Sequence, residues 1–275
     1  MRPITKLVSV FSGCLVVVGL TVASPAGDRG GRAPLVAEDF EQAGDDLAAR
    51  LAADEHLSIV AGQGVNGSHG LKTRYVGYPR GSKRVIATYP LGDKVSEATL
   101  QYDVKFDHDF QFVTGGKLHG LAPKDRITGG SPMKPHGWSA RIMFQERGKL
   151  GSYIYCQDKD SKYGQGRGAR GFTFEKGRYY AISFHIKLNA PADRDNGFAR
   201  IYVNGQKLVD HRNIQYRAAE GKRTRIQKLL FSTFHGGHSP EDAPRDDQGE
   251  YTTVHAYFDN FSVYPGRKIR ARPGG

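Results

Sequence analysis

The sequence predicts an all-β fold, a sandwich of two antiparallel sheets with a short helical segment before it. From about residue 58 onward, short runs alternate apolar and polar side chains, and Gly, Pro, Asn and Asp separate these runs. No segment after residue 60 keeps a helical period over three turns. Strict alternation gives each sheet one apolar face, and two such faces bury each other in a sandwich. At 275 residues, the chain is long enough for one large β domain.

Residues 1–26 have the pattern of a secretory signal peptide. Arg2 and Lys6 precede an apolar run over residues 7–22, and small residues follow. This run of about 16 residues is shorter than the roughly 20 that a membrane-spanning helix needs. We therefore expect cleavage of this leader and a secreted or periplasmic protein, with an uncleaved anchor as the alternative. Cleavage leaves Cys156 as the single cysteine, which excludes an intramolecular disulfide.

The rest of the chain divides into three predicted parts. Residues 27–57 are predicted to be a linker and a short helical segment, because residues 35–57 are acidic, rich in alanine and partly helical in period. The β domain is predicted over residues 58–266, and the basic residues 267–275 form a frayed tail. The pair Asn204-Gly205 predicts a two-residue type I′ turn in a hairpin. The clearest strands lie in residues 98–107, 179–189, 199–210 (the hairpin), 227–237 and 254–266.

Two further strands carry charged and aromatic side chains. In WSARIMF, residues 138–144, a period of two puts Trp138, Ala140, Ile142 and Phe144 on one face and Ser139, Arg141 and Met143 on the other. A connection of hairpin length leads to SYIYCQ, residues 152–157, so we expect these two strands to be antiparallel neighbours. The alternative is ordinary cross-strand packing of two tyrosines, with an arginine stem covering apolar surface. With the loop GGKLHG at residues 115–120, the predicted polar patch contains Lys117, His119, Ser139, Arg141, Tyr153 and Tyr155.

Charge and residue spacing limit the partners. The formal net charge of +12 at pH 7 indicates an acidic partner, and export favours an anionic polysaccharide over nucleic acid, for which the chain has no motif. Solubility alone is the alternative explanation of this charge.

No Cys/His cluster has zinc spacing, and we expect no cofactor and a monomer. The acidic loop at residues 239–250, with Asp259, could hold a structural calcium ion. No strand carries the alternating carboxylates of a retaining glycoside hydrolase.

Several motifs together resemble a known family. GGKLHG, GWSARIMFQERGKLGSYIYCQ, FTFEKGRYYAISFHIKLN, NGFARIYVNGQKL and FDNFSVYPG follow one another with recognisable spacing between about residues 70 and 265. They resemble the alginate and polyuronate lyases of algal viruses and molluscs, polysaccharide lyase family fourteen. The resemblance implies a β-jelly roll whose concave face holds the sugar chain. It also implies functional roles for Lys117, Ser139, Arg141, Tyr153 and Tyr155.

The resemblance implies a secreted lyase that cleaves an alginate-like or glucuronan-like polyuronate by β-elimination. Arg141 and Lys117 would neutralise the uronate carboxylate, because charge grows there in the transition state. Tyr155 is our predicted base, or a shared base and acid, and Tyr153 would hold the sugar or protonate the leaving oxygen; which of the two tyrosines is the base and which the acid stays open. Ser139 would donate or accept a hydrogen bond. The substrate-binding residues that we expect are His119, Gln145, His185, Lys187 and His235.

The residues leave two alternatives, one for the base and one for the class of protein. The histidines offer alternative bases, and His119 stands where the family pattern suggests a proline or a small residue. A non-catalytic carbohydrate-binding module would use the same basic, aromatic face, so it remains the alternative to an enzyme. The histidines considered as bases are His119, His136, His185 and His235.

Overall fold

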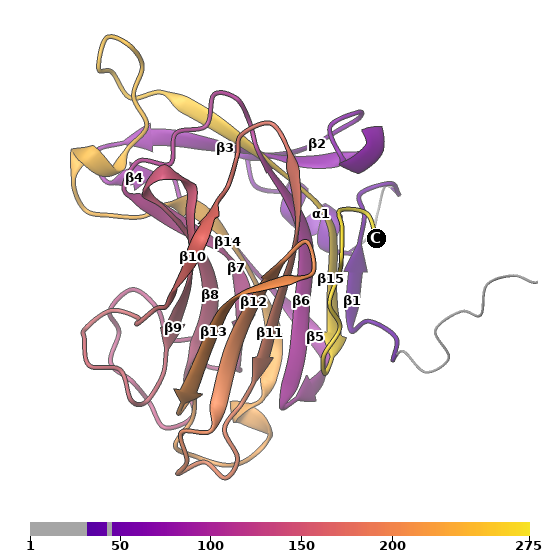
Figure 1. Ribbon diagram of the computed structural model, residues 1–275, viewed down its shortest axis with the longest axis vertical. Helices are drawn as coiled ribbons and strands as arrows, with labels where there is room; N and C mark the ends of the chain where they lie inside the picture. The colour runs from indigo at the N-terminus through magenta and orange to yellow at the C-terminus, as the bar shows by residue number, and fades with distance from the viewer. Residues whose placement is uncertain (1–31, 43–45) are drawn as a thin grey trace, which may run out of the picture. The chain divides into compact units, whose positions relative to one another are not determined.

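The computed structural model describes residues 32–42 and 46–275, and these form a sandwich of two antiparallel sheets. The predicted fold class is therefore confirmed. Figure 1 shows the two sheets face to face. One contains β6 (Glu97–Phe106), β11 (Tyr179–Lys187) and β12 (Gly197–Val203), and the other contains β7 (Gly115–Ala122), β8 (Ser139–Gln145) and β9 (Lys149–Tyr155). The predicted signal peptide, residues 1–26, lies outside the described residues. Within the described part of the chain, no helix is long and apolar enough to cross a membrane.

The larger sheet has nine strands and lies on the side away from the predicted patch. Its order is β13-β12-β11-β6-β15-β3-β2, while β1 pairs with β15 and β4 with β3. The predicted hairpin is confirmed, because Asn204 and Gly205 have positive φ between β12 and β13. The nine strands are β1 (Val36–Glu38), β2 (Leu57–Val60), β3 (Gly70–Tyr78), β4 (Gly81–Ser82), β6 (Glu97–Phe106), β11 (Tyr179–Lys187), β12 (Gly197–Val203), β13 (Gln206–Ile214) and β15 (Thr253–Pro265).

The smaller sheet has six strands and carries the predicted patch. Its order is β10-β9-β8-β7-β14-β5. The two strands that the sequence predicts to be antiparallel neighbours, β8 and β9, pair in this way and are the second and third strands from the β10 edge. Its edge strand β10 lies close to β13, the edge of the larger sheet. The six strands are β5 (Val85–Val95), β7 (Gly115–Ala122), β8 (Ser139–Gln145), β9 (Lys149–Tyr155), β10 (Gly168–Thr173) and β14 (Ile226–His235).

The core lies between the two sheets and is rich in aromatic rings. Phe144 from β8 and Phe106 from β6 are fully buried, and their ring centroids are 5.6 Å apart in an edge-to-face contact. Trp138 is also fully buried, and its indole Nε1 donates to the Thr224 carbonyl at 2.8 Å. Replacing a buried Phe such as Phe144 with Ala typically costs about 3–5 kcal/mol. This packing holds the smaller sheet rigid behind the patch.

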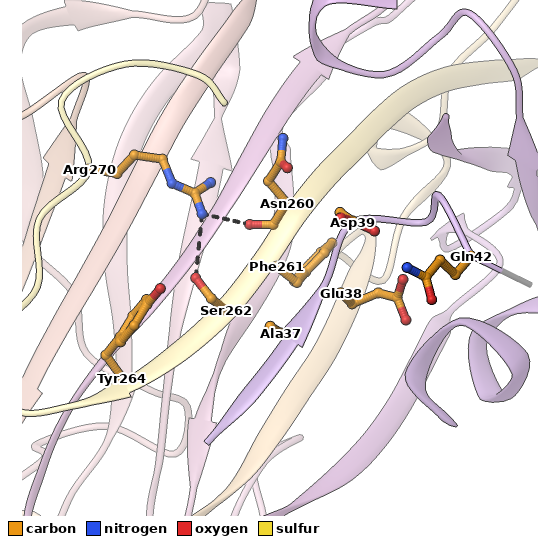
Figure 2. Close-up of a pocket in the computed structure, with 9 residues that line it drawn as sticks. All are labelled: Ala37, Glu38, Asp39, Gln42, Asn260, Phe261, Ser262, Tyr264 and Arg270. Carbon is orange, nitrogen blue, oxygen red and sulfur yellow. Dashed lines mark hydrogen bonds between the residues drawn. The ribbon is translucent and has the colours of Figure 1, made fainter. Parts of the chain in front are cut away.

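The segment before the main strands contains one short helix, α1 (Asp46–Ala52), as well as β1 and the start of β2. Glu38 ties this segment together, because its carboxylate accepts hydrogen bonds from the N–H groups of Phe40 at 2.7 Å and Ala48 at 3.0 Å. Next to it, a pocket of about 300 Å³ lies between β1 and β15 (Figure 2). Among the side chains that line this pocket, Arg270 joins the C-terminal segment to Asn260 and Ser262 of β15.

The C-terminal residues pack on the outer face of the larger sheet, so the prediction of a frayed tail is wrong. Arg270 forms an ion pair with the fully buried Asp103 at 3.2 Å, and its Nη2 donates to the Asn260 carbonyl at 2.9 Å. Figure 2 shows this guanidinium reaching Asn260 and Ser262. The buried carboxylate needs a cation, and the tail supplies it.

Candidate active site

Register between β8 and β9 creates the candidate site. Arg141 pairs with Tyr153 and Ser139 with Tyr155, so all four side chains share the face turned away from the core. The apolar residues between them, such as Ile142 and Ile154, are fully buried on the other face. The sequence predicted this arrangement through the period of two.

A β-bulge in β7 places Lys117 on the same outer face. Lys117 pairs with Met143 and Gly120 with Arg141, so two residues of β7, Leu118 and His119, lie opposite one residue of β8. The side chains of Leu118 and His119 both turn into the core. Gly120 is required at this close approach, since a Cβ there would lie 1.9 Å from the carbonyl oxygen of Ala140.

Lys117 lies in a cationic and largely buried environment. Its Nζ is 3.9 Å from the ring centroid of Tyr153 and 3.4 Å from the sulfur of Met143. Burial, followed by the positive charges of Arg141 and Arg84, lowers the pKa of Lys117 to about 7. Lys117 therefore exchanges a proton near neutral pH.

Arg141 and Tyr153 keep their protons at neutral pH. Burial lowers the pKa of Arg141 to about 10, and its Nη1 donates to Ser232 Oγ at 3.4 Å. Burial, followed by the neighbouring Tyr155, raises the pKa of Tyr153 to about 12. The guanidinium carbon of Arg141 lies 5.5 Å from the Tyr153 ring centroid. The site therefore combines a fixed cation, a lysine that titrates near neutrality and a protonated phenol.

Ser139 and Tyr155 hold the long loop at residues 123–138 against the site. Ser139 Oγ donates to the Ile127 carbonyl at 2.6 Å, and the Gly130 N–H donates to the Tyr155 hydroxyl at 2.9 Å. Tyr155 also lines the pocket described next, whereas Ser139 is buried beneath the loop.

The outer face of the smaller sheet contains a pocket of about 210 Å³, which we call the catalytic pocket. Besides the predicted residues, Arg84 lines it, stacked 4.7 Å from the Phe234 ring. Tyr163 and His238 come from two different loops and approach each other, with 3.4 Å between the Tyr163 hydroxyl and His238 Nε2. The residues that line the pocket are Arg84, Ile86, Lys117, Thr128, Gly129, Arg141, Tyr153, Tyr155, Tyr163, Phe234, Gly236, Gly237 and His238.

The sequence did not predict Arg84, Tyr163 and His238, and each lies outside a regular strand. Loop residues follow no period that would aim a side chain at the sheet. The loop with His238 is held by Asp242, whose carboxylate accepts from the N–H groups of His238 at 2.9 Å and Ser239 at 3.0 Å. For His238, the preceding pair Gly236-Gly237 was the one local sequence feature that could have indicated a functional loop.

Four of the residues expected to bind substrate lie apart from the catalytic pocket. His119 and His235 are fully buried in the core, since the bulge and the regular phase of β14 turn them inward. His185 and Lys187 lie on the outer face of the larger sheet, on the other side of the sandwich, and both contact Glu97. Gln145 is on the outer face of β8, and it lines a groove beside Tyr153.

The residues proposed as a further base, His136, and as a calcium ligand, Asp259, both have other partners in the structure. His136 pairs with Asp125 at 3.4 Å and is absent from the lining of the catalytic pocket. Asp259 accepts from Val65 N–H at 2.8 Å and Ser68 Oγ at 3.0 Å, so its oxygens already serve the fold. Among the described residues, one group, Asp107, Asp109 and His255, has the spacing that a metal ion needs. It lies outside the catalytic pocket.

The catalytic pocket contains three basic side chains and three tyrosines but no carboxylate among its described lining residues. A glycosidase of the two-carboxylate type cannot operate with such a set. The arrangement instead suits an anionic substrate whose charge is neutralised while a proton is removed next to it. The opposite pKa changes of Lys117 and Tyr153 provide one proton acceptor and one proton donor near neutral pH.

Comparisons with known proteins give a family match and several structures of similar fold. The family model for polysaccharide lyase 14 matches residues 71–261. No curated protein matches the sequence. Similar solved structures include a marine alginate lyase from Aplysia kurodai, with 20% identity and a TM-score of 0.67, covering 85% of this chain and 100% of that one.

Two other solved structures have the same fold. A mutant of the alginate lyase Aly36B in complex with an alginate trisaccharide is 25% identical, with a TM-score of 0.62, and the match covers 72% of this chain and 82% of that chain. An endo-β-1,4-glucuronan lyase from the fungus Trichoderma reesei is 15% identical, with a TM-score of 0.62, covering 88% of this chain and 99% of that one.

Proposed function

Because the chain belongs to the polysaccharide lyase 14 family, as its motifs predicted, we propose that it cleaves an anionic polyuronate by β-elimination. The substrate class is alginate or a glucuronan, the polymers named for the similar structures. The single observation that carries the proposal is the catalytic pocket, whose described lining residues include no carboxylate and in which Lys117 and Arg141 flank Tyr153.

The proposed reaction breaks the C4–O bond of a uronate. A base takes the proton from C5, the electron pair of that bond forms the C4–C5 double bond, and the leaving oxygen at C4 receives a proton. The C5 proton is weakly acidic until the neighbouring carboxylate is neutralised, because the intermediate carries a second negative charge there. Arg141 suits this task, since its guanidinium is cationic at neutral pH and can donate two parallel hydrogen bonds.

Lys117 is the proposed base. The sequence analysis favoured Tyr155 as the base, left the choice between Tyr155 and Tyr153 open, and gave Lys117 the role of a point charge. The pKa of about 7 for Lys117 supports moving the role of base to this residue. A neutral amine is then available at neutral pH, and a general base works best when its pKa is near the operating pH. Once protonated, the ammonium adds to the positive charge beside the carboxylate.

Tyr153 is the proposed acid for the leaving oxygen. Its raised pKa of about 12 keeps the phenol protonated at neutral pH, and its ring contacts both cations. Tyr155 would hold the loop at Gly130 and the sugar, because its hydroxyl already accepts the Gly130 N–H. We also propose secretion, on the pattern of residues 1–26 alone, which the N-terminal sequence of exported protein tests.

A panel of purified alginate, glucuronan and pectate tests the function through the ultraviolet absorbance of the unsaturated product. We expect turnover on at least one polymer, and Arg141→Ala should reduce kcat about a hundredfold or more with an unchanged circular dichroism spectrum. Lys187→Ala is a matched control, since this lysine lies on the other sheet. Binding without any product on every polymer would favour a carbohydrate-binding module and refute the enzyme.

A further inference from the structure

We infer that the polyuronate chain continues from the catalytic pocket along a basic track to the edge of the sandwich, where Arg167 and Arg170 bind its carboxylates. This inference rests on the proposed function and extends it to the residues that bind the distant part of the substrate. The basic track consists of Gln145, Arg167, Arg170 and Lys207, with Gly151, Gly166 and Gly168 as its floor.

Shared lining residues make the track continuous with the catalytic pocket. Tyr153 lines both the catalytic pocket and a groove of about 270 Å³ that also contains Gln145 and Arg167. Arg167 in turn lines a wider groove of about 840 Å³ between β10 and β13, with Arg170 and Lys207. One sugar chain can therefore contact all three hollows in order.

The floor of the track lacks side chains because glycines line it. Gly151 is on β9 two residues from Tyr153, on the same face and about 7 Å along the strand. Next to it, a Cβ at Gly166 would lie 2.2 Å from the Ser152 carbonyl oxygen, so the loop can approach β9 only with glycine there. The absence of side chains leaves space for a polymer beside Tyr153.

The positive charges of Arg167 and Arg170 are not neutralised by described acidic side chains. Among residues 32–42 and 46–275, neither Arg167 nor Arg170 has a carboxylate within ion-pair distance, and both are exposed. Asp210 is the one acidic side chain among the described residues that line the wider groove, and it is already shared by Lys207 at 2.9 Å, by Arg200 at 3.0 Å and by Arg212. The groove therefore keeps a net positive charge that a row of uronate carboxylates would complement.

The backbone of Arg167 is fixed in place, which distinguishes it from a freely mobile surface arginine. Its N–H donates to Ser152 Oγ at 3.0 Å, and its carbonyl accepts the Ser152 N–H at 3.0 Å. Ser152 Oγ also contacts His211 Nδ1 on β13 at 3.0 Å. Arg167 thus stands where the two sheets meet, and the track follows this line.

The test compares Arg167→Ala/Arg170→Ala with the control Arg50→Ala/Arg74→Ala. The control removes the same charge from exposed sites on α1 and β3, and four strands separate β3 from β13 in the larger sheet. Kinetics are measured on the polymer that is cleaved fastest and on its trisaccharide. We expect KM for the polymer to rise about fivefold with kcat within about twofold, while the trisaccharide is unaffected.

Arg167→Lys/Arg170→Lys should restore most of the polymer KM, because the charge returns. An unchanged polymer KM, an equal rise in the control, or an equal rise for the trisaccharide would overturn the track. If the unmodified protein cleaves no polymer, the proposed function fails. The basic track is then tested separately, by the retardation of the protein during electrophoresis in gels that contain alginate. Loss of retardation in Arg167→Ala/Arg170→Ala alone supports it, and equal migration of both double variants overturns it.

Discussion

Replacing Lys117 with methionine should make the protein more stable and inactive. The folded structure lowers the pKa of Lys117 from 10.5 to about 7, mainly through burial. At 1.36 kcal/mol for each pKa unit, the protonated lysine costs the folded state up to about 5 kcal/mol. Methionine avoids this cost but loses the cation–π contact with Tyr153, worth about 1–2 kcal/mol. The net expectation is a gain of about 3 kcal/mol at about pH 6.

The dependence of this gain on pH identifies its cause. Between the folded pKa of about 7 and the ordinary value of 10.5, the unfolded chain keeps a proton that folded Lys117 has lost. The stability of the unmodified protein therefore rises with pH in this window, and the advantage of Lys117→Met shrinks by about 1.4 kcal/mol per pH unit.

Urea unfolding at a series of pH values measures both effects. The control Lys94→Met removes an exposed lysine at the end of β5 and should change the free energy of unfolding by less than about 0.5 kcal/mol. A Lys117→Met protein that is less stable than the unmodified one at about pH 6, or a difference that does not vary with pH, would refute the reasoning.

Three more predictions concern the site and its support. If Lys117 is the base, kcat/KM should rise with pH through about 7, whereas a purely cationic role gives a fall over the same range in a pH–rate profile. His119→Leu leaves the Ser232 N–H without its acceptor and should cost about 1–3 kcal/mol in urea unfolding, with KM within about twofold; a large KM change would return His119 to the substrate site. Arg270→Met leaves the Asp103 carboxylate buried and unpaired, for a cost of about 3–5 kcal/mol, which Asp103→Leu in the same chain should partly recover if the charge is the cause.

Alternation in the sequence was sufficient to predict the sheet face that carries the site. On β8 and β9, every second residue faces the core, so Arg141 and Tyr153 could be assigned to one surface without coordinates. The Asn204-Gly205 turn was equally readable, because few residues adopt positive φ twice in succession.

The bulge in β7 could not be predicted from the sequence. It inserts one residue with no change in composition, and the insertion turns His119 into the core although Lys117, two residues earlier, faces the pocket. The contact between Asp103 and Arg270 joins residues far apart in the chain, and only the folded sheet brings the basic tail to the carboxylate. Arg84, Tyr163 and His238 were missed for a related reason, since loop geometry depends on tertiary contacts such as those of Asp242.

The alternation on β8 also makes activity a probe of correct folding. A slip of one residue against β7 or β9 would turn Trp138 and Phe144 outward and bury Arg141, so a chain in the wrong register loses its core and its site together. Refolded protein should therefore contain fully active molecules and inactive ones, with no weakly active population. The fraction of turnover regained after dilution from urea then counts the chains whose strands have found their native partners.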